Sequence, residues 1–193
     1  MLNKLKALLL TLTVLAAAPA MATTEDYGTL LSGSYQPSET FASLSVTGGG
    51  SVYDFTLTAF DLNSIFTTGA FIGAIAVNTD PGLTPVISNV VGDAPVSVSP
   101  GGGPTGQWEF RFDLTGPQQA RLTANETVSF TATFASPVAF VGDEFALHVQ
   151  GLTEAQGGSA WYVSSPVPEP ESYAMMLAGL GLMGFVARRR KNS

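Results

Sequence analysis

Apolar and polar residues alternate along the middle of the chain, and this period of two predicts β-strands. The clearest case is residues 108–114, where every second residue from Trp108 to Leu114 is large and apolar and the intervening ones are charged. Further strands are expected at residues 41–46, 52–58, 70–77, 85–91, 128–134, 145–150 and 160–163. Glycine and proline turns separate them, and no stretch of helical period appears between residues 23 and 165. This spacing predicts an all-β fold, a β-sandwich or jelly-roll-like ectodomain.

The first 22 residues have the pattern of a secretory signal peptide. Lys4 and Lys6 precede an uncharged apolar stretch at residues 7–18, and small residues follow it. A basic start, an apolar middle and a small-residue end define such leaders, which are removed on export. We expect cleavage after Ala22, with Ala20 as the nearest alternative.

The last residues have the pattern of a membrane stop. A polar spacer at residues 166–172 leads into an apolar run at residues 173–187, which we expect to form a transmembrane helix, and a basic tail at residues 188–193. Cations at such an end stay on the cytoplasmic side, which places the rest of the chain outside. The residues of this stop are Arg188, Arg189, Arg190 and Lys191.

A helix over the apolar run would be about 22 Å long, whereas the hydrocarbon core of a bilayer is about 30 Å thick. A transient anchor and a permanent single-pass anchor both fit this length.

The spacer, the apolar run and the arginines together resemble the sorting signal of PEP-CTERM proteins, over about residues 166–193. The residues of this sorting signal that open the spacer are Val167, Pro168, Glu169 and Pro170. The resemblance implies export from a Gram-negative bacterium and recognition by an exosortase. It also implies transient anchoring in the inner membrane, cleavage near Pro168 to Pro170, and association with exopolysaccharide in a biofilm or at the cell surface. A second resemblance, to the FxDxF subgroup of these proteins, depends on Asp54 alone.

The charges divide sharply between the ends and the middle of the chain. Six of the eight lysines and arginines lie in the two end segments, so Arg111 and Arg121 alone remain in the domain at residues 23–165. The same domain keeps 13 of the 15 acids, a net charge of −11. A phosphate backbone needs a basic face, so nucleic-acid binding is excluded. A cationic partner, calcium or simple solubility remains. The chain has no cysteine and therefore no disulfide.

Catalytic residues are sparse, and we expect no enzyme. His148 is the one histidine of the chain, which is too few for a zinc site, and no nucleophile motif accompanies it. Paired carboxylates could hydrolyse sugars, but scattered acids do not specify a pair. Calcium prefers hard oxygen ligands from loops, and solvated loop acids are the simpler alternative. The candidate calcium ligands are Asp61, Asn63, Asp143 and Glu144.

Two tryptophans are the candidate ligand-binding residues. Trp161 and Trp108 could stack on sugar rings, or they could fill the core as strand aromatics commonly do. We therefore carry two functional hypotheses. The first is a non-enzymatic surface or matrix protein that an exosortase sorts and that associates with exopolysaccharide. The alternative is a carbohydrate-binding module, with or without a calcium requirement.

Overall fold

The structure is a computed structural model that describes residues 21–67, 69–79, 82–104, 108–138 and 140–165. Within these residues ten strands form one sheet, with two short helical turns at its margins. The strands are β1 (Met21–Ser32), β2 (Ala42–Gly49), β3 (Val52–Ala59), β4 (Phe71–Thr79), β5 (Val86–Gly92), β6 (Ser97–Pro100), β7 (Phe110–Asp113), β8 (Thr127–Thr133), β9 (Phe140–Gln150) and β10 (Ser159–Ser164). The turns are α1 (Leu62–Ile65) and the 3-10 turn η1 (Glu154–Gln156). The all-β prediction is confirmed, and all eight expected strands are present.

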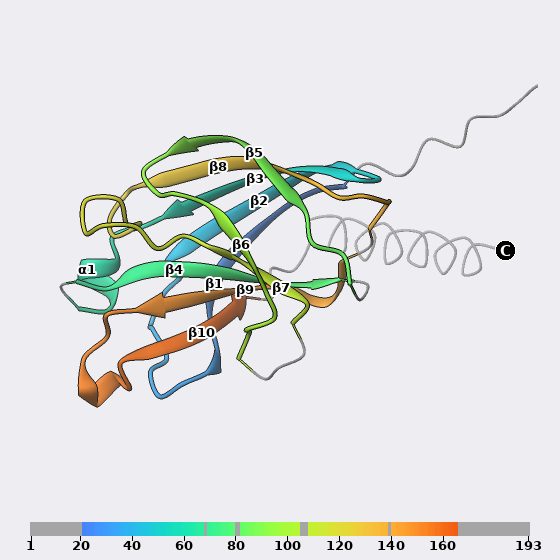
Figure 1. Ribbon diagram of the computed structural model, residues 1–193. Helices are drawn as coiled ribbons and strands as arrows, with labels where there is room; N and C mark the ends of the chain where they lie inside the picture. The colour runs from blue at the N-terminus through green and yellow to red at the C-terminus, as the bar shows by residue number, and fades with distance from the viewer. Residues whose placement is uncertain (1–20, 68, 80–81, 105–107, 139, 166–193) are drawn as a thin grey trace, which may run out of the picture.

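The strands lie in the order β5-β8-β3-β2-β1-β10-β9-β4-β7-β6, and every neighbouring pair is antiparallel. The two edge strands of the sheet, β5 and β6, are consecutive in the chain and are joined by residues 93–96. Such a short connection forces the edges together, so the sheet curls until β5 and β6 come into contact. Figure 1 shows this arrangement, with β5 and β8 above β9 and β10.

The sequence predicted a sandwich of sheets, whereas the described strands form one continuous sheet whose halves face each other. The strand responsible is β1, which the sequence pattern did not predict. It pairs with β2 on one side and with β10 on the other and so joins the two halves. Its pairing with β10 shifts register after Tyr27 and again after Leu30. Such irregularities sharpen the local twist and bend of a strand, which fits a sheet that turns at this point.

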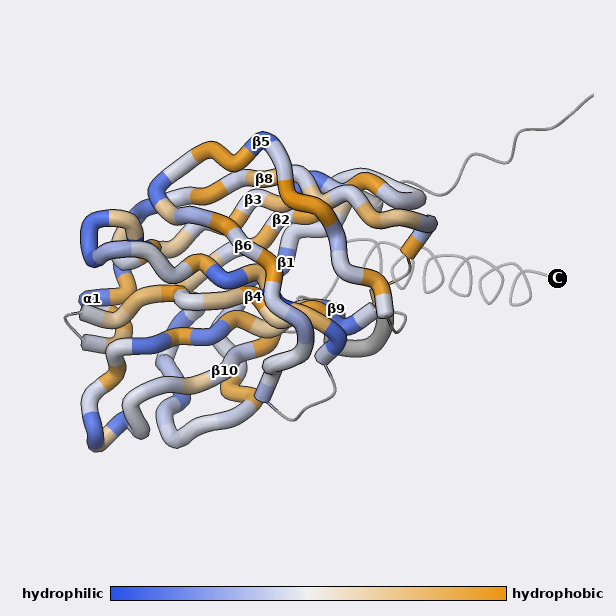
Figure 2. Tube along the Cα trace, in the orientation of Figure 1, coloured by the Kyte–Doolittle hydropathy of each residue, from blue (hydrophilic) through white to orange (hydrophobic). Residues whose placement is uncertain are grey.

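The core fills the space between the two halves and is rich in phenylalanine. Apolar and polar residues are interleaved along the strands, as Figure 2 shows, and most of the large apolar side chains are buried. Phe55 on β3 stacks on Phe130 of β8 at 5.2 Å between ring centroids. It also meets Phe112 of β7 edge-on at 5.1 Å and Phe145 of β9 at 5.7 Å. The contacts with Phe112 and Phe145 cross from one half of the sheet to the other and join the halves into a single hydrophobic core.

Candidate functional site

An open cleft lies on the outer face of the half formed by β4, β7, β9 and β10. The strand register places Asp113, Ala74, His148 and Trp161 in one row across these four strands. The cleft has a volume of about 370 Å³, within the range of about 300–1,000 Å³ that ligand sites occupy. Its lining residues are Gly73, Ala74, Gly102, Arg111, Asp113, Thr115, His148, Gln150 and Trp161.

Strand β4 makes the cleft hollow because its outward residues are small. Its inward residues, Ile72, Ile75 and Val77, are fully buried in the core. A register shift after Ile72 turns both Gly73 and Ala74 toward the outside. The larger side chains of β7 and β9 stand on either side, so the cleft floor lies along β4.

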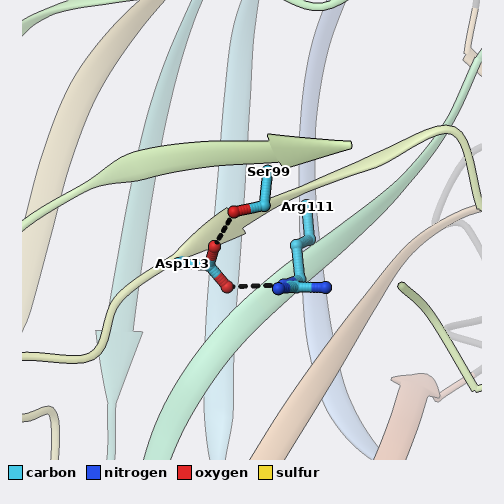
Figure 3. A network of polar contacts seen from close by, with 3 residues as sticks. All are labelled: Ser99, Arg111 and Asp113. Atoms are coloured by element: carbon cyan, nitrogen blue, oxygen red, sulfur yellow. Dashed lines mark hydrogen bonds and ion pairs between the residues drawn. The ribbon is translucent and has the colours of Figure 1, made fainter. Parts of the chain in front are cut away.

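One wall of the cleft is a polar network on β6 and β7, shown in Figure 3. The Arg111 Nε donates to Asp113 Oδ1 at 2.6 Å, and the Ser99 hydroxyl donates to the other carboxylate oxygen. Arg111 and Asp113 are two residues apart on one strand, so they share its outer face. Among the described residues, the terminal guanidinium nitrogens of Arg111 have no hydrogen-bond partner.

The loop after β6 passes directly over this guanidinium group. A Cβ placed on Gly102 would collide with Arg111 Nη1, and Gly102 has a φ of +85°. The positive φ favours glycine at this position, and a larger residue would also displace the end of the Arg111 side chain. The loop therefore confines the Arg111 side chain, which remains 34 % exposed.

The opposite wall is an aromatic stack between two neighbouring strands. His148 on β9 and Trp161 on β10 are directly opposite in the ladder, and their rings stack at 4.3 Å with 6° between the planes. Burial, and then the positive charge of Arg111, lower the pKa of His148 below its ordinary value. The imidazole is therefore neutral at pH 7, with one nitrogen that donates and one that accepts.

The two candidate tryptophans come together on the outer face but differ in exposure. Trp108 is 8 % exposed and packs on Ala76 and Ala146, while Trp161 lies partly exposed beside this small cluster. Trp108 therefore fills space under the surface, and only Trp161 lines the cleft. Because His148 covers one face of the Trp161 indole, at most the other face is open to a sugar.

The sequence placed Trp108 on the same face as Phe110, and the structure shows that this was wrong. Phe110 is buried in the main core, whereas Trp108 belongs to the separate outer cluster. The reason is that β7 begins only at Phe110. A residue ahead of the regular ladder is not bound by the alternation of the strand.

The candidate calcium ligands fall at different places along the sheet. The Asp61 side chain caps α1 by accepting from the Ser64 amide at 3.4 Å, and Asn63 Oδ1 accepts from the Gly69 amide at 3.0 Å. Both precede the start of β4. Asp143 and Glu144 lie on β9 beside the far end of β4, where Phe145 pairs with Val77.

The Asp143 side chain lies outside the described part of the structure, so the set of four candidate calcium ligands stays a prediction. Within the described part of the chain, no three His, Asp or Glu residues gather as a metal site would require. The pKa of Glu144 is raised, first by burial of its carboxyl group and second by the negative charge of Glu25.

The predicted sorting elements lie outside the described residues. These are the leader up to residue 20, the spacer with Val167, Pro168, Glu169 and Pro170, the apolar run, and the basic stop at residues 188–191. In the described ranges, no helix has the length and apolar character needed to cross a bilayer.

Sequence reasoning singled out Trp161 but did not join it to the other cleft residues. The signal for Arg111 and Asp113 was present, because the alternation of residues 108–114 places both on the polar face. No local signal shows that β7 and β10 flank the β4–β9 pair, because those pairings join distant segments of the chain.

Comparison with known families identifies the end of the chain. The model of the PEP-CTERM protein-sorting motif matches residues 166–191. Neither a curated protein nor a solved structure matches the chain. The match covers the tail and leaves the ligand of the β domain to be argued from the cleft.

Proposed function

We propose that this chain, which carries a PEP-CTERM sorting motif at residues 166–191, is a non-enzymatic protein of the cell surface or extracellular matrix that binds exopolysaccharide. The motif indicates an extracellular protein that an exosortase sorts in a Gram-negative bacterium. The further steps are our proposal. The leader at residues 1–22 directs export, residues 173–187 hold the protein briefly in the inner membrane, and cleavage near Pro168 to Pro170 releases it.

The position of the domain's last residue supports this route. The Ser165 amide donates to the Asp26 carbonyl at 2.7 Å, so the chain is tied to β1 just before the spacer begins. Residues 166–172 reach at most about 25 Å when fully extended. A folded domain held by the apolar run would therefore stay near the membrane, with the spacer as the exposed substrate of a membrane enzyme.

The observation that favours glycan binding is the cleft. It places an aromatic stack, His148 with Trp161, opposite a charged donor and acceptor, Arg111 with Asp113. Aromatic surface for the C–H face of a sugar and fixed polar groups for its hydroxyls are what a site for a small polar ligand needs. Tethering to exopolysaccharide and the carbohydrate-binding alternative thus become one hypothesis with one site.

A binding role fits His148 better than a catalytic role. A catalytic histidine must reach a nucleophile and be oriented by an acid. Within the described residues, the His148 ring makes no hydrogen bond to a hydroxyl or carboxylate, and it stacks on Trp161 instead. This supports the proposal that the cleft holds a glycan without cleaving it.

Fractionation of the producing cells tests the sorting proposal. We expect the intact chain to be recovered from the surface or matrix with a mass lower by both the leader and the tail. Deletion of residues 166–193 should change its destination. Recovery of the unprocessed chain in the cytoplasm would contradict the proposal.

Retention on the organism's own exopolysaccharide tests the binding proposal. The wild-type protein should be retained and Trp161→Ala should not, at an unchanged melting temperature. Trp108→Phe, which alters the buried tryptophan outside the cleft, is the matched control and should be retained. Repeating the assay with a chelator tests the calcium requirement. Equal retention of Trp161→Ala and wild type would refute this site.

A further inference from the structure

We propose that the cleft recognises a neutral pyranose through two adjacent hydroxyl groups, with Arg111 as the donor and Asp113 as the acceptor. This inference depends on the proposed glycan binding and specifies the class of sugar. It follows from the unused hydrogen-bonding capacity of the ion pair, the local charge, and the shape of the cleft.

The Arg111–Asp113 pair keeps most of its hydrogen-bonding capacity. A guanidinium has five N–H donors and an ionised carboxylate about four acceptor positions. Within the described residues Arg111 uses only Nε, and Asp113 accepts one bond at each oxygen, from Arg111 and from Ser99. A fixed donor beside a fixed acceptor matches two neighbouring hydroxyls, one of which accepts while the other donates. A single hydroxyl would satisfy only one of the two groups.

The charge of the cleft favours a neutral sugar. The positive charge of Arg111 is balanced by Asp113 at 2.6 Å, and His148 is neutral because its pKa is lowered. The second arginine of the domain is already engaged, since Arg121 lies 4.3 Å over the Phe71 ring and donates to the Gly116 carbonyl. A uronate carboxylate would find no unbalanced cation in the cleft and would meet Asp113. The net charge of −11 on the domain adds long-range repulsion of polyanions.

The remaining lining completes a site for one face of a sugar ring. The floor is Ala74, which is 3 % exposed and offers only a methyl group. The edges of the His148–Trp161 stack supply aromatic surface, while the Gln150 amide and the Thr115 hydroxyl supply polar groups. A pyranose has the same division, with C–H groups on its faces and hydroxyls around its rim.

The experiment measures binding of the full-length protein, held in a polyoxyethylene detergent because sugar-based detergents would compete. The probes are immobilised dextran, mannan, xylan and galactan, together with anionic polygalacturonate. Each neutral polymer is also presented after periodate oxidation and borohydride reduction, which cleave the carbon–carbon bond between adjacent hydroxyls and leave the chain. The charge-assisted bonds at issue are each worth about tenfold in affinity.

We expect at least one neutral polymer to bind and its oxidised form to bind about tenfold more weakly or not at all. Arg111→Gln and Arg111→Lys should each weaken binding by about tenfold, because lysine keeps the charge but lacks the planar fork. Arg121→Gln is the matched control, since it removes the other arginine outside the cleft, and it should bind as wild type does. Affinity should change less than about twofold between about 50 and 500 mM salt. Melting temperatures identify any variant that is misfolded.

The outcomes separate this inference from the proposed function. If a neutral polymer binds through Trp161 but oxidation and the Arg111 variants have no effect, glycan binding stands and the recognition of adjacent hydroxyls is refuted. Salt-sensitive binding of polygalacturonate would refute the neutral sugar. If neither the panel nor the native exopolysaccharide binds, both proposals fail.

Discussion

Replacing Phe55 by alanine should destabilise both halves of the sheet together. Phe55 lies on β3 and is fully buried, yet its ring contacts Phe112 and Phe145 in the opposite half. Phenylalanine-to-alanine changes in cores cost about 3–5 kcal/mol from lost transfer energy and the cavity left behind. A domain of this size has a total stability of about 5–15 kcal/mol. The substitution should therefore remove a large fraction of the stability.

Urea unfolding followed by tryptophan fluorescence measures this coupling. Trp108 and Trp161 are the only two tryptophans of the chain, and both lie on the half opposite Phe55. With a slope of about 2 kcal/mol per molar urea, a loss of about 4 kcal/mol lowers the midpoint by about 2 M. Far-UV circular dichroism reports all strands and should give the same midpoint. Coincidence of the two signals is the mark of a single cooperative unit.

The control is the next residue on the same strand. Thr56 points outward and bonds the Ser129 hydroxyl at 3.0 Å, so Thr56→Val should cost less than about 1 kcal/mol. Suppose that Phe55→Ala shifts the circular dichroism transition but leaves the fluorescence midpoint unmoved. The two halves would then unfold independently, and the account of one core shared across a continuous sheet would be wrong.

Three further predictions concern stability. Burial and the nearby arginine lower the pKa of His148 in the folded protein, so the unfolded state binds a proton at this residue more readily. The melting temperature should therefore fall as the pH drops below about 6.5. His148→Phe should make this fall smaller. Burial and a neighbouring carboxylate raise the pKa of Glu144, which disfavours its charged form at neutral pH. Glu144→Gln should therefore melt higher than wild type at pH 7, and the gain should vanish as the pH falls through that pKa. Gly92 has a φ of +122° and no room for a Cβ against the Thr127 carbonyl, whereas Gly50 has a φ of +63° and open space. Gly92→Ala should lower the free energy of unfolding, measured by urea titration, by more than about 2 kcal/mol, and Gly50→Ala should lower it by about 1 kcal/mol. Equal losses for the two variants would contradict the steric argument.

The sequence by itself determined the class of the fold and the sorting motif at residues 166–191. Alternation is a local property, so it identified eight strands and placed Arg111 and Asp113 on the polar face of their strand. It failed at β1, whose Glu25 and Asp26 break the apolar pattern, and at β6, which has only four residues and ends at Pro100. The motif at residues 166–191 is a linear pattern of hydropathy and charge, and it could be identified from the sequence for that reason.

Only the tertiary structure decided how the strands combine and where a ligand could bind. The alternation of apolar and polar residues specifies which side of a strand a residue faces, but it carries no information on which other strand pairs with that strand. The pairing of β1 with β10 made one sheet out of an expected sandwich, and the pairing of β4 with β9 and β7 placed a floor of small residues between Arg111 and His148. Those contacts join segments that are far apart in the chain, and their energies depend on the whole core closing. The cleft therefore exists only once these four strands have paired.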